Sequence, residues 1–162
     1  MKPKVSILVP FFNEEENITP LLAEVRRVCD TLGHTYEAIF VNDGSTDATG
    51  RRLIEATKNW PEAKSFHSRA NHGQAAALFF GMKHTAGDIL ITLDGDGQND
   101  PADIPRLLAV LGDFDMVAGV RAHRQDSWLR LAISRLANGC GPRSLATVSA
   151  IQVAGSRHFG VR

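Results

Sequence analysis

Short apolar runs alternate along this sequence with longer segments whose apolar residues recur at helical spacing. The run at 89–93 is rich in β-branched residues and lies between a charge and an aspartate–glycine cluster, a pattern typical of a buried strand. Similar runs predict further strands at 5–9, 36–41, 63–67 and 116–120, and the periodic segments predict helices over about 18–32, 47–59, 71–87, 102–111 and 126–138. This alternation predicts a doubly wound α/β fold with a parallel sheet.

Two of the predicted helices carry end signals. Thr19 before Pro20 fits an N-cap and first helical position, and Gly33 fits a stop, so we expect the first helix to begin at Pro20. Asp100 before Pro101 has the same form and predicts the start of the fourth helix.

Polar residues follow three of the predicted strands, at 10–16, 42–47 and 94–98. Because the carboxyl ends of parallel strands share one edge of a sheet, we expect these clusters to meet in one crevice, where open α/β sheets bind their ligands. Single acids after strands are common helix caps, whereas three clusters in succession favour a nucleotide site. The sequence has no Gly-x-Gly-x-x-Gly after its first strand and no Walker lysine motif, which argues against a dinucleotide oxidoreductase or a P-loop enzyme.

The cluster at 94–98 reads Asp-Gly-Asp-Gly-Gln. Its two carboxylates repel each other unless a cation lies between them, and a hard divalent ion that also binds phosphate oxygens fits that need. A calcium loop of the EF-hand type fails, because its glycine at position six is Asn99 here and its glutamate at position twelve is Pro105. A purely structural turn before the next helix accounts for Asp100 but leaves the first two carboxylates unexplained.

Composition and charge narrow the range of functions. The chain has 162 residues, of which 43% are hydrophobic and 22% charged, which fits one globular domain. The formal net charge of zero argues against nucleic acid as a partner. All 18 acids lie at or before Asp126, whereas residues 127–162 carry five arginines and no acid. That basic end fits an anionic acceptor or a membrane surface, and equally a short tail with no such role.

The cysteines and the hydropathy predict where in the cell the protein is located. Cys29 and Cys140 are isolated and lack metal-ligand spacing, which predicts a reduced, cytoplasmic setting. The sequence shows no signal-peptide pattern, and no apolar run approaches the ~20 residues that span a bilayer. Contact with a membrane is therefore expected to be peripheral, at its cytoplasmic face, through the helix at 126–138 and the basic tail; packing of that helix in the core stays open as the alternative.

Four motifs in combination resemble those of one family. They read Val-Pro-Phe-Phe-Asn-Glu-Glu-Glu-Asn at 9–17, Val-Asn-Asp-Gly-Ser-Thr-Asp at 41–47, Asn-His-Gly-Gln-Ala-Ala-Ala at 71–77 and Leu-Asp-Gly-Asp-Gly-Gln-Asn-Asp-Pro at 93–101. The sequence thus resembles the family-two inverting glycosyltransferases of the GT-A fold, and within them the dolichyl- and undecaprenyl-phosphate sugar transferases. Residues 119–138 resemble the acceptor side of that branch, so the resemblance covers about residues 4–138.

The resemblance implies a three-layer GT-A fold with a mainly parallel central sheet, and a role for each matching residue. Nucleotide-sugar contacts are implied for Pro10, Glu14, Asp43 and Asp94, and the ligands of Mg²⁺ or Mn²⁺ are implied to be Asp94, Asp96 and Gln98. The implied catalytic residues are Asp94, Asp96 and Arg121, and the implied acceptor-phosphate residues are Arg121, Arg124, Arg130, Ser134 and Arg135. The implied reaction moves a hexose or a modified pentose from a GDP- or UDP-sugar to a polyprenyl phosphate with inversion.

The end of the sequence departs from that branch. We expect a GT-A domain over 1–138 and a divergent tail over 139–162, which contains no acid. Within the tail, 148–153 fits either a strand or a helix, and for the arginines of the 126–138 helix a solvated face stays open as an alternative role. Two functions follow: an active metal-dependent transferase, or a non-catalytic nucleotide-sugar-binding fragment of such an enzyme.

Overall fold

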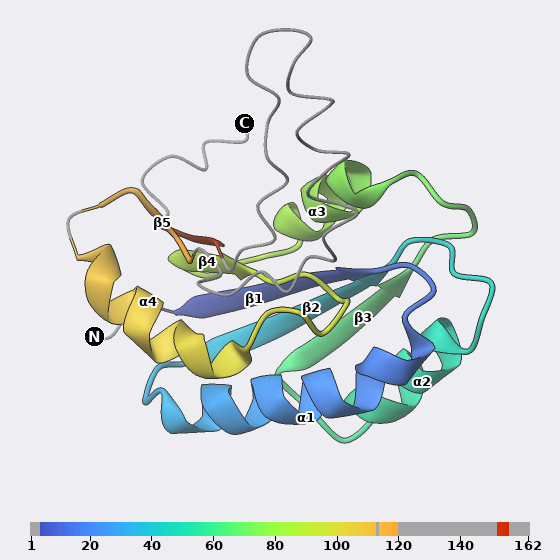
Figure 1. The fold of residues 1–162 in the computed structure, drawn as a ribbon, viewed down its shortest axis with the longest axis horizontal. Coiled ribbons are helices and arrows are strands. Elements are labelled where there is room, and N and C mark those ends of the chain that lie inside the picture. The colour runs from blue at the N-terminus through green and yellow to red at the C-terminus, as the bar shows by residue number, and fades with distance from the viewer. Residues whose placement is uncertain (1–3, 113, 120–151, 156–162) are drawn as a thin grey trace, which may run out of the picture.

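In the computed structural model, which describes residues 4–112, 114–119 and 152–155, a sheet lies between helices on both of its faces (Figure 1). Its strand order is β3-β2-β1-β4-β6-β5. The strands are β1 Val5–Phe11, β2 Tyr36–Asn42, β3 Ala63–His67, β4 Ile89–Thr92, β5 Met116–Ala118 and β6 Gln152–Gly155. The first four run parallel, and β6 lies antiparallel between β4 and β5. The predicted α/β fold with a mainly parallel sheet is therefore confirmed.

Helices cover the two faces unequally within the described residues. They are α1 Glu15–Thr31, α2 Thr49–Thr57, α3 Gln74–Met82 and α4 Ile104–Leu111, the last preceded by the 3₁₀ turn η1 Pro101–Asp103. Three of them, α1, α2 and α4, pack on one face, and α3 lies on the other (Figure 1). Asp100 caps η1, as expected, by accepting the N–H of Ala102 at 2.9 Å. No helix in this part of the chain has both the length and the apolar character needed to cross a bilayer.

Side chains alternate along β1 and so divide the core into two clusters. Val5, Ile7 and Val9 are fully buried in the cluster that faces α1, α2 and α4, whereas Leu8 is buried in the cluster beneath α3. Gly81 of α3 approaches the sheet so closely that an added Cβ would stand 2.2 Å from Leu8 Cδ1. This close contact packs the last turn of α3 against β1.

The start of α1 differs from the prediction. The helix begins at Glu15 rather than at Pro20, so Thr19 and Pro20 lie inside it and the predicted cap is wrong. The free N–H groups at the helix start find an acceptor elsewhere, because the N–H of Glu14 donates to Oγ1 of Thr49 at 2.8 Å. An acceptor supplied by the first residue of α2 lets the helix start earlier than the local sequence indicates.

Two other segments refine the prediction. α3 begins at Gln74 instead of residue 71, because Gly73 has φ +89°, a left-handed conformation outside the helix, and α3 ends at Met82, before the predicted end near residue 87. In the tail, where 148–153 was predicted as either a strand or a helix, residues 152 and 153 belong to the strand β6. The predicted helix at 126–138 lies outside the described residues, and the domain boundary at 138 stays a prediction.

Candidate functional site

The loops that follow β1, β2 and β4 leave the sheet at one edge. β1 pairs in parallel with β2 on one side and with β4 on the other, so the carboxyl ends of the three strands are neighbours. The last pair of the β1–β2 ladder joins Phe11 to Asn42, and just beyond β4 the N–H of Leu93 donates to the carbonyl oxygen of Leu8. We call this side of the sheet the carboxyl edge. The three polar clusters predicted to share one edge all leave the sheet here.

Reciprocal hydrogen bonds clasp the β1–α1 loop to the β2–α2 loop. The N–H of Asn13 donates to Oγ of Ser45 at 2.9 Å, and Oδ1 of Asn13 accepts the N–H of Thr46 at 2.8 Å. Oε2 of Glu15 accepts the N–H of Ala48, also at 2.8 Å. Asn13 has φ +55°, a left-handed conformation that asparagine tolerates better than most residues. The polar residues of both loops are thus held in a fixed relative position.

The carboxylate of Asp47 also links the two loops. Its carboxylate accepts the N–H of Thr49 at 2.9 Å and the N–H of Glu15 at 3.2 Å. Burial alone would raise the pKa of Asp47, but the hydrogen bonds from the hydroxyl and N–H of Thr49 and from the N–H of Glu15 outweigh it and lower the pKa. Asp47 therefore connects the two loops through one ionised carboxylate.

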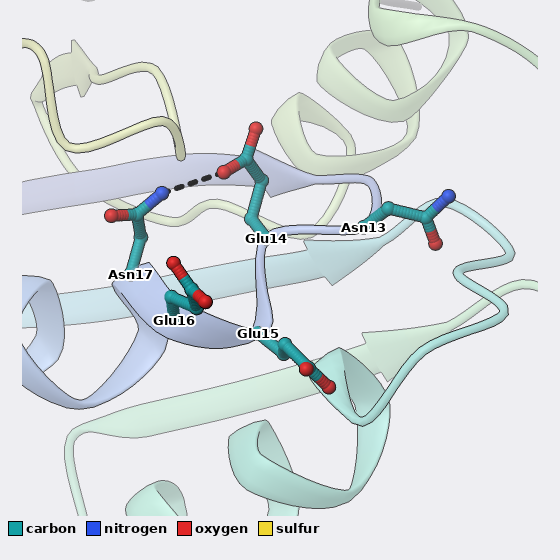
Figure 2. Close-up of a pocket in the computed structure, with 5 residues that line it drawn as sticks. All are labelled: Asn13, Glu14, Glu15, Glu16 and Asn17. Carbon is teal, nitrogen blue, oxygen red and sulfur yellow. Dashed lines mark hydrogen bonds between the residues drawn. The ribbon is translucent and has the colours of Figure 1, made fainter.

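A polar hollow of about 240 Å³ opens beside the start of α1 and is lined by residues 13–17 (Figure 2). Within it, Oε2 of Glu14 accepts the side-chain amide of Asn17 at 2.6 Å. Asn17 in turn adjoins the loop after β4, because a Cβ added to Gly97 would stand 3.1 Å from its Oδ1. The predicted nucleoside residue Glu14 is thus linked through one side chain to the aspartate–glycine loop.

Asp43 joins the end of β2 to the loop before α3. Its side chain is buried, and its two oxygens accept the N–H of His72 at 3.0 Å and the N–H of Gly73 at 2.8 Å. Gly44 makes this contact sterically allowed, because it has φ +70° and an added Cβ would stand 2.3 Å from the carbonyl carbon of Ala70. Asp43 therefore fixes the residues that lead into α3.

Asp94 lies between two side-chain amides at the same edge. Its Oδ1 accepts Nε2 of Gln74 at 2.8 Å, and its Oδ2 accepts Nδ2 of Asn99 at 3.3 Å. The next residue, Gly95, is buried against the end of β1, where an added Cβ would stand 2.5 Å from the carbonyl oxygen of Pro10. The absence of a side chain at Gly95 lets this loop close onto the sheet.

The donor atoms of this loop suit a hard divalent cation in part. Oδ1 of Asp96 accepts the N–H of Gln98 at 2.9 Å, and Asp94 and Asp96 flank the buried Gly95. Carboxylate and amide oxygens are ligands that Mg²⁺ and Mn²⁺ accept. Yet no group of three or more histidine, cysteine or acidic side chains in the described residues is arranged to hold a metal. The donor set therefore fits a cation only together with oxygens from a bound phosphate group.

Sequence reasoning missed some residues of the site and predicted others that lie outside the described residues. Gln74 and Asn99 stand inside quoted motifs, but nothing in the sequence indicated that they would converge on Asp94 from both sides. The predicted acceptor residues Arg121, Arg124, Arg130, Ser134 and Arg135 lie outside the described residues. Their roles stay predictions, as do the ligand contacts of Pro10, Glu14, Asp43, Asp94, Asp96 and Gln98.

Comparison with known families gives one match that spans nearly the whole chain. The profile described as "Glycosyl transferase family 2" matches residues 6–152. That range includes all three polar clusters of the carboxyl edge and the first residue of β6.

Two enzymes of known structure have a similar fold. A mannosyltransferase from Pyrobaculum calidifontis, in complex with GDP-Man and Mn²⁺, has a TM-score of 0.70 and 20% identity over 96% of this chain and 45% of its own. Glucosyl-3-phosphoglycerate synthase from M. tuberculosis has a TM-score of 0.66 and 24% identity over 95% of this chain and 58% of its own. The same enzyme with Mn²⁺, UDP and glucosyl-3-phosphoglycerate has a TM-score of 0.64 and 23% identity. This chain spans about half the length of these proteins, and at such identity the likeness shows a shared fold.

Proposed function

Because this chain belongs to glycosyl transferase family 2, we propose that it moves a sugar from a GDP- or UDP-sugar to a polyprenyl phosphate, with inversion and with Mg²⁺ or Mn²⁺. The observation that carries the proposal is the convergence of Glu14, Asp43 and Asp94 at the ends of three neighbouring parallel strands. Such an edge is where open α/β sheets bind nucleotides. The mannosyltransferase bound to GDP-Man and the synthase bound to UDP have the same fold, which supports the class of donor.

In this proposal Pro10, Glu14 and Asp43 bind the nucleoside. The two carboxylate oxygens of Asp43 offer about four lone-pair sites, so it can keep its bonds to the N–H groups of His72 and Gly73 and still accept one from a base or ribose. Glu14 lies half-buried beside the polar hollow, where a sugar hydroxyl could donate to it. Both carboxylates would select for donor groups, which nucleoside bases and ribose supply.

Asp94 and Asp96, with Gln98, would hold the divalent cation together with the diphosphate. When bound, the cation stabilises the negative charge that develops on the departing nucleoside diphosphate. Asp94 would also orient the ribose–diphosphate part of the donor. The Mn²⁺ present in both kinds of solved complex supports a divalent ion of this type.

The nucleophile would be an oxygen of the acceptor phosphate. Its second pKa near ~6 leaves the monoester largely ionised at pH 7, so the attack on the anomeric carbon needs no strong general base. The bond from that carbon to the diphosphate oxygen breaks as the new carbon–oxygen bond forms on the opposite face. Arg121, Arg124, Arg130, Arg135 and Ser134 are proposed to position the acceptor phosphate, since arginine binds phosphate oxygens bidentately. A lipid acceptor would bring the protein to the cytoplasmic face of a membrane.

The donor half of the proposal is tested by ligand-induced stabilisation. We expect one GDP- or UDP-sugar to raise the melting temperature in the presence of Mg²⁺ or Mn²⁺, since a ligand at 100 times its Kd stabilises by ~2.7 kcal/mol. A panel of both nucleotide series, each with and without metal, identifies the base and the sugar together. A panel in which no nucleoside diphosphate changes the melting temperature, with or without metal, would contradict the proposed donor.

A non-catalytic nucleotide-sugar-binding fragment remains the second candidate. The acid-free segment 139–162 favours it, because residues that would shape the acceptor side differ there from the pattern of the branch. A misplacement of ~1 Å between reacting groups can cost ~10²-fold in rate, so binding can persist while transfer fails. Single-turnover transfer from a radiolabelled nucleotide sugar to a short-chain polyprenyl phosphate separates the two. Rapid transfer would exclude the fragment, and nucleotide binding without transfer would exclude the enzyme.

A further inference from the structure

The short segment 72–74 touches both ends of the proposed donor site. The N–H groups of His72 and Gly73 bind the carboxylate of Asp43, and the side chain of Gln74 binds the carboxylate of Asp94. Asp43 follows β2 and Asp94 follows β4, so the segment spans the carboxyl edge across β1, which lies between those strands. One stretch of three residues therefore connects the proposed nucleoside group to the proposed metal group.

We propose that Gln74 is a positioning residue, which holds the carboxylate of Asp94 in the orientation that metal–diphosphate binding requires. The inference rests on the proposed function and adds to it a residue that the motif assignments leave without a role. Nε2 of Gln74 donates to Oδ1 of Asp94 at 2.8 Å, and Nδ2 of Asn99 donates to Oδ2, the other oxygen, at 3.3 Å. With both oxygens held, the plane of the carboxylate is fixed before a ligand arrives.

The chemistry of the amide suits this task. A lysine or arginine at position 74 would neutralise Asp94 and compete with the cation, whereas a neutral amide donor orients the carboxylate and leaves its charge available. Loss of a group that hydrogen-bonds a metal-ligating carboxylate typically lowers the metal affinity ~10–100-fold.

The backbone around Gln74 is well suited to hold the side chain in place. Gln74 is the first residue of α3, and α3 is seated on β1 through the close contact of Gly81 with Leu8. On its other side, the preceding turn is bound by Asp43. The donor thus extends from a segment that is anchored at both ends, which is what a positioning role requires.

The test removes the donor and keeps the size of the side chain. In Gln74→Met, we expect the Mn²⁺ concentration that gives half-maximal tightening of nucleoside diphosphate binding to rise by ~10–100-fold. Calorimetry of GDP and UDP across a Mn²⁺ series measures this value. Nucleotide affinity in EDTA and the melting temperature of the unliganded protein should stay as in the unaltered chain, because the bonds of Asp43 to His72 and Gly73 remain.

A matched control separates positioning from damage to the loop. Asn71→Ala removes a hydrogen bond inside the same loop, from the N–H of Gly73 to Oδ1 of Asn71 at 3.1 Å, and leaves Gln74 and Asp94 intact. It should keep the Mn²⁺ dependence of the unaltered chain. Two results for Gln74→Met would overturn the inference. One is an unchanged Mn²⁺ dependence of nucleotide binding. The other is a lower melting temperature together with an equal loss of nucleotide affinity with and without metal. If the unaltered chain itself binds no nucleoside diphosphate with Mn²⁺, the proposed function fails, and this inference fails with it.

Discussion

At the amino edge of the sheet, the side where β1, β2 and β4 begin, Glu37 lies in a closed polar cluster, whereas at the carboxyl edge Asp94 lies in a loop outside the strands. Oε1 of Glu37 accepts the hydroxyl of Ser6 at 2.7 Å and the N–H of Ala86 at 2.6 Å, and Oε2 stands 3.4 Å from Nζ of Lys4. The chain itself thus supplies the donors and the countercharge that this carboxylate needs. The side chain of Glu37 is only 7% exposed, but Asp43 at the carboxyl edge is equally buried, so the two edges differ in the partners of their carboxylates rather than in burial.

The carboxyl edge differs because its carboxylates are held mainly through amides. Asp43 is bound by two backbone N–H groups, and Asp94 by the side chains of Gln74 and Asn99. Amide donors fix the orientation of a carboxylate without removing its charge. The comparison teaches that a buried acid with its own cation serves the fold, whereas several acids oriented by amides at one strand edge are suited to a cation and a polar ligand.

The largest expected effect comes from removing one carboxylate at the carboxyl edge. In Asp96→Ala, we expect the Mn²⁺-dependent affinity for a nucleoside diphosphate to fall by more than ~100-fold, since loss of a ligand should exceed the ~10–100-fold effect of an outer partner. The fold should persist, because Asp96 accepts a local hydrogen bond from the N–H of Gln98, two residues along the chain. Calorimetry of nucleotide binding, together with urea unfolding, measures both quantities.

The same strand offers the matched control. Asp88 precedes β4 at the amino edge and accepts the N–H of Lys4 at 2.8 Å, whereas Asp94 and Asp96 follow β4 at the carboxyl edge. Asp88→Ala should leave nucleotide and metal titrations unchanged. If Asp96→Ala titrates like Asp88→Ala, the assignment of the metal to this loop is wrong.

A smaller effect, on stability alone, is expected at the amino edge. Glu37→Ala leaves the Ser6 hydroxyl, the Ala86 N–H and the Lys4 ammonium without their acceptor, and hydrogen bonds to a charged group contribute about 2 kcal/mol. Urea unfolding should show that loss, while nucleotide affinity stays constant. Glu62→Ala, at an exposed position, is the control and should change the free energy of unfolding by less than ~0.5 kcal/mol. Reduced nucleotide affinity at full stability would show that Glu37 acts on the site.

Much of this architecture could be predicted from local patterns. The apolar runs predicted the first five strands, and the rule that parallel strands end at one edge predicted that the three polar clusters would lie together. Those features depend on neighbouring residues or on a general property of sheets. The strand pattern could not show that β6 would enter the sheet between β4 and β5, because its 4 residues are few and come from a distant part of the chain.

The features that sequence reasoning missed depend on pairs of residues far apart in the chain. The start of α1 depends on Thr49, which is 35 positions from Glu14. The orientation of Asp94 depends on Gln74, 20 positions away, and the cluster of Glu37 includes Ala86, 49 positions away. A signal existed for Glu37, which is a charged residue within an otherwise apolar strand. Its partners follow only from the register and the packing of α3.

The smallest expected effect is a pH dependence of stability from the amino edge. Burial acts to raise the pKa of Glu37, but the N–H of Ala86, the hydroxyl of Ser6 and the charge of Lys4 outweigh it, so the pKa in the folded protein is lowered. A lowered pKa means that the carboxylate stabilises the fold above its unfolded value of about 4.3, and that this contribution is lost as the pH falls through the folded value. Glu37→Gln removes the titrating group, so urea midpoints between pH 7 and pH 3 should fall less steeply than in the unaltered chain. Parallel slopes for the two proteins would mean that the cluster does not hold Glu37 ionised, and the contrast between the two edges would then rest on geometry alone.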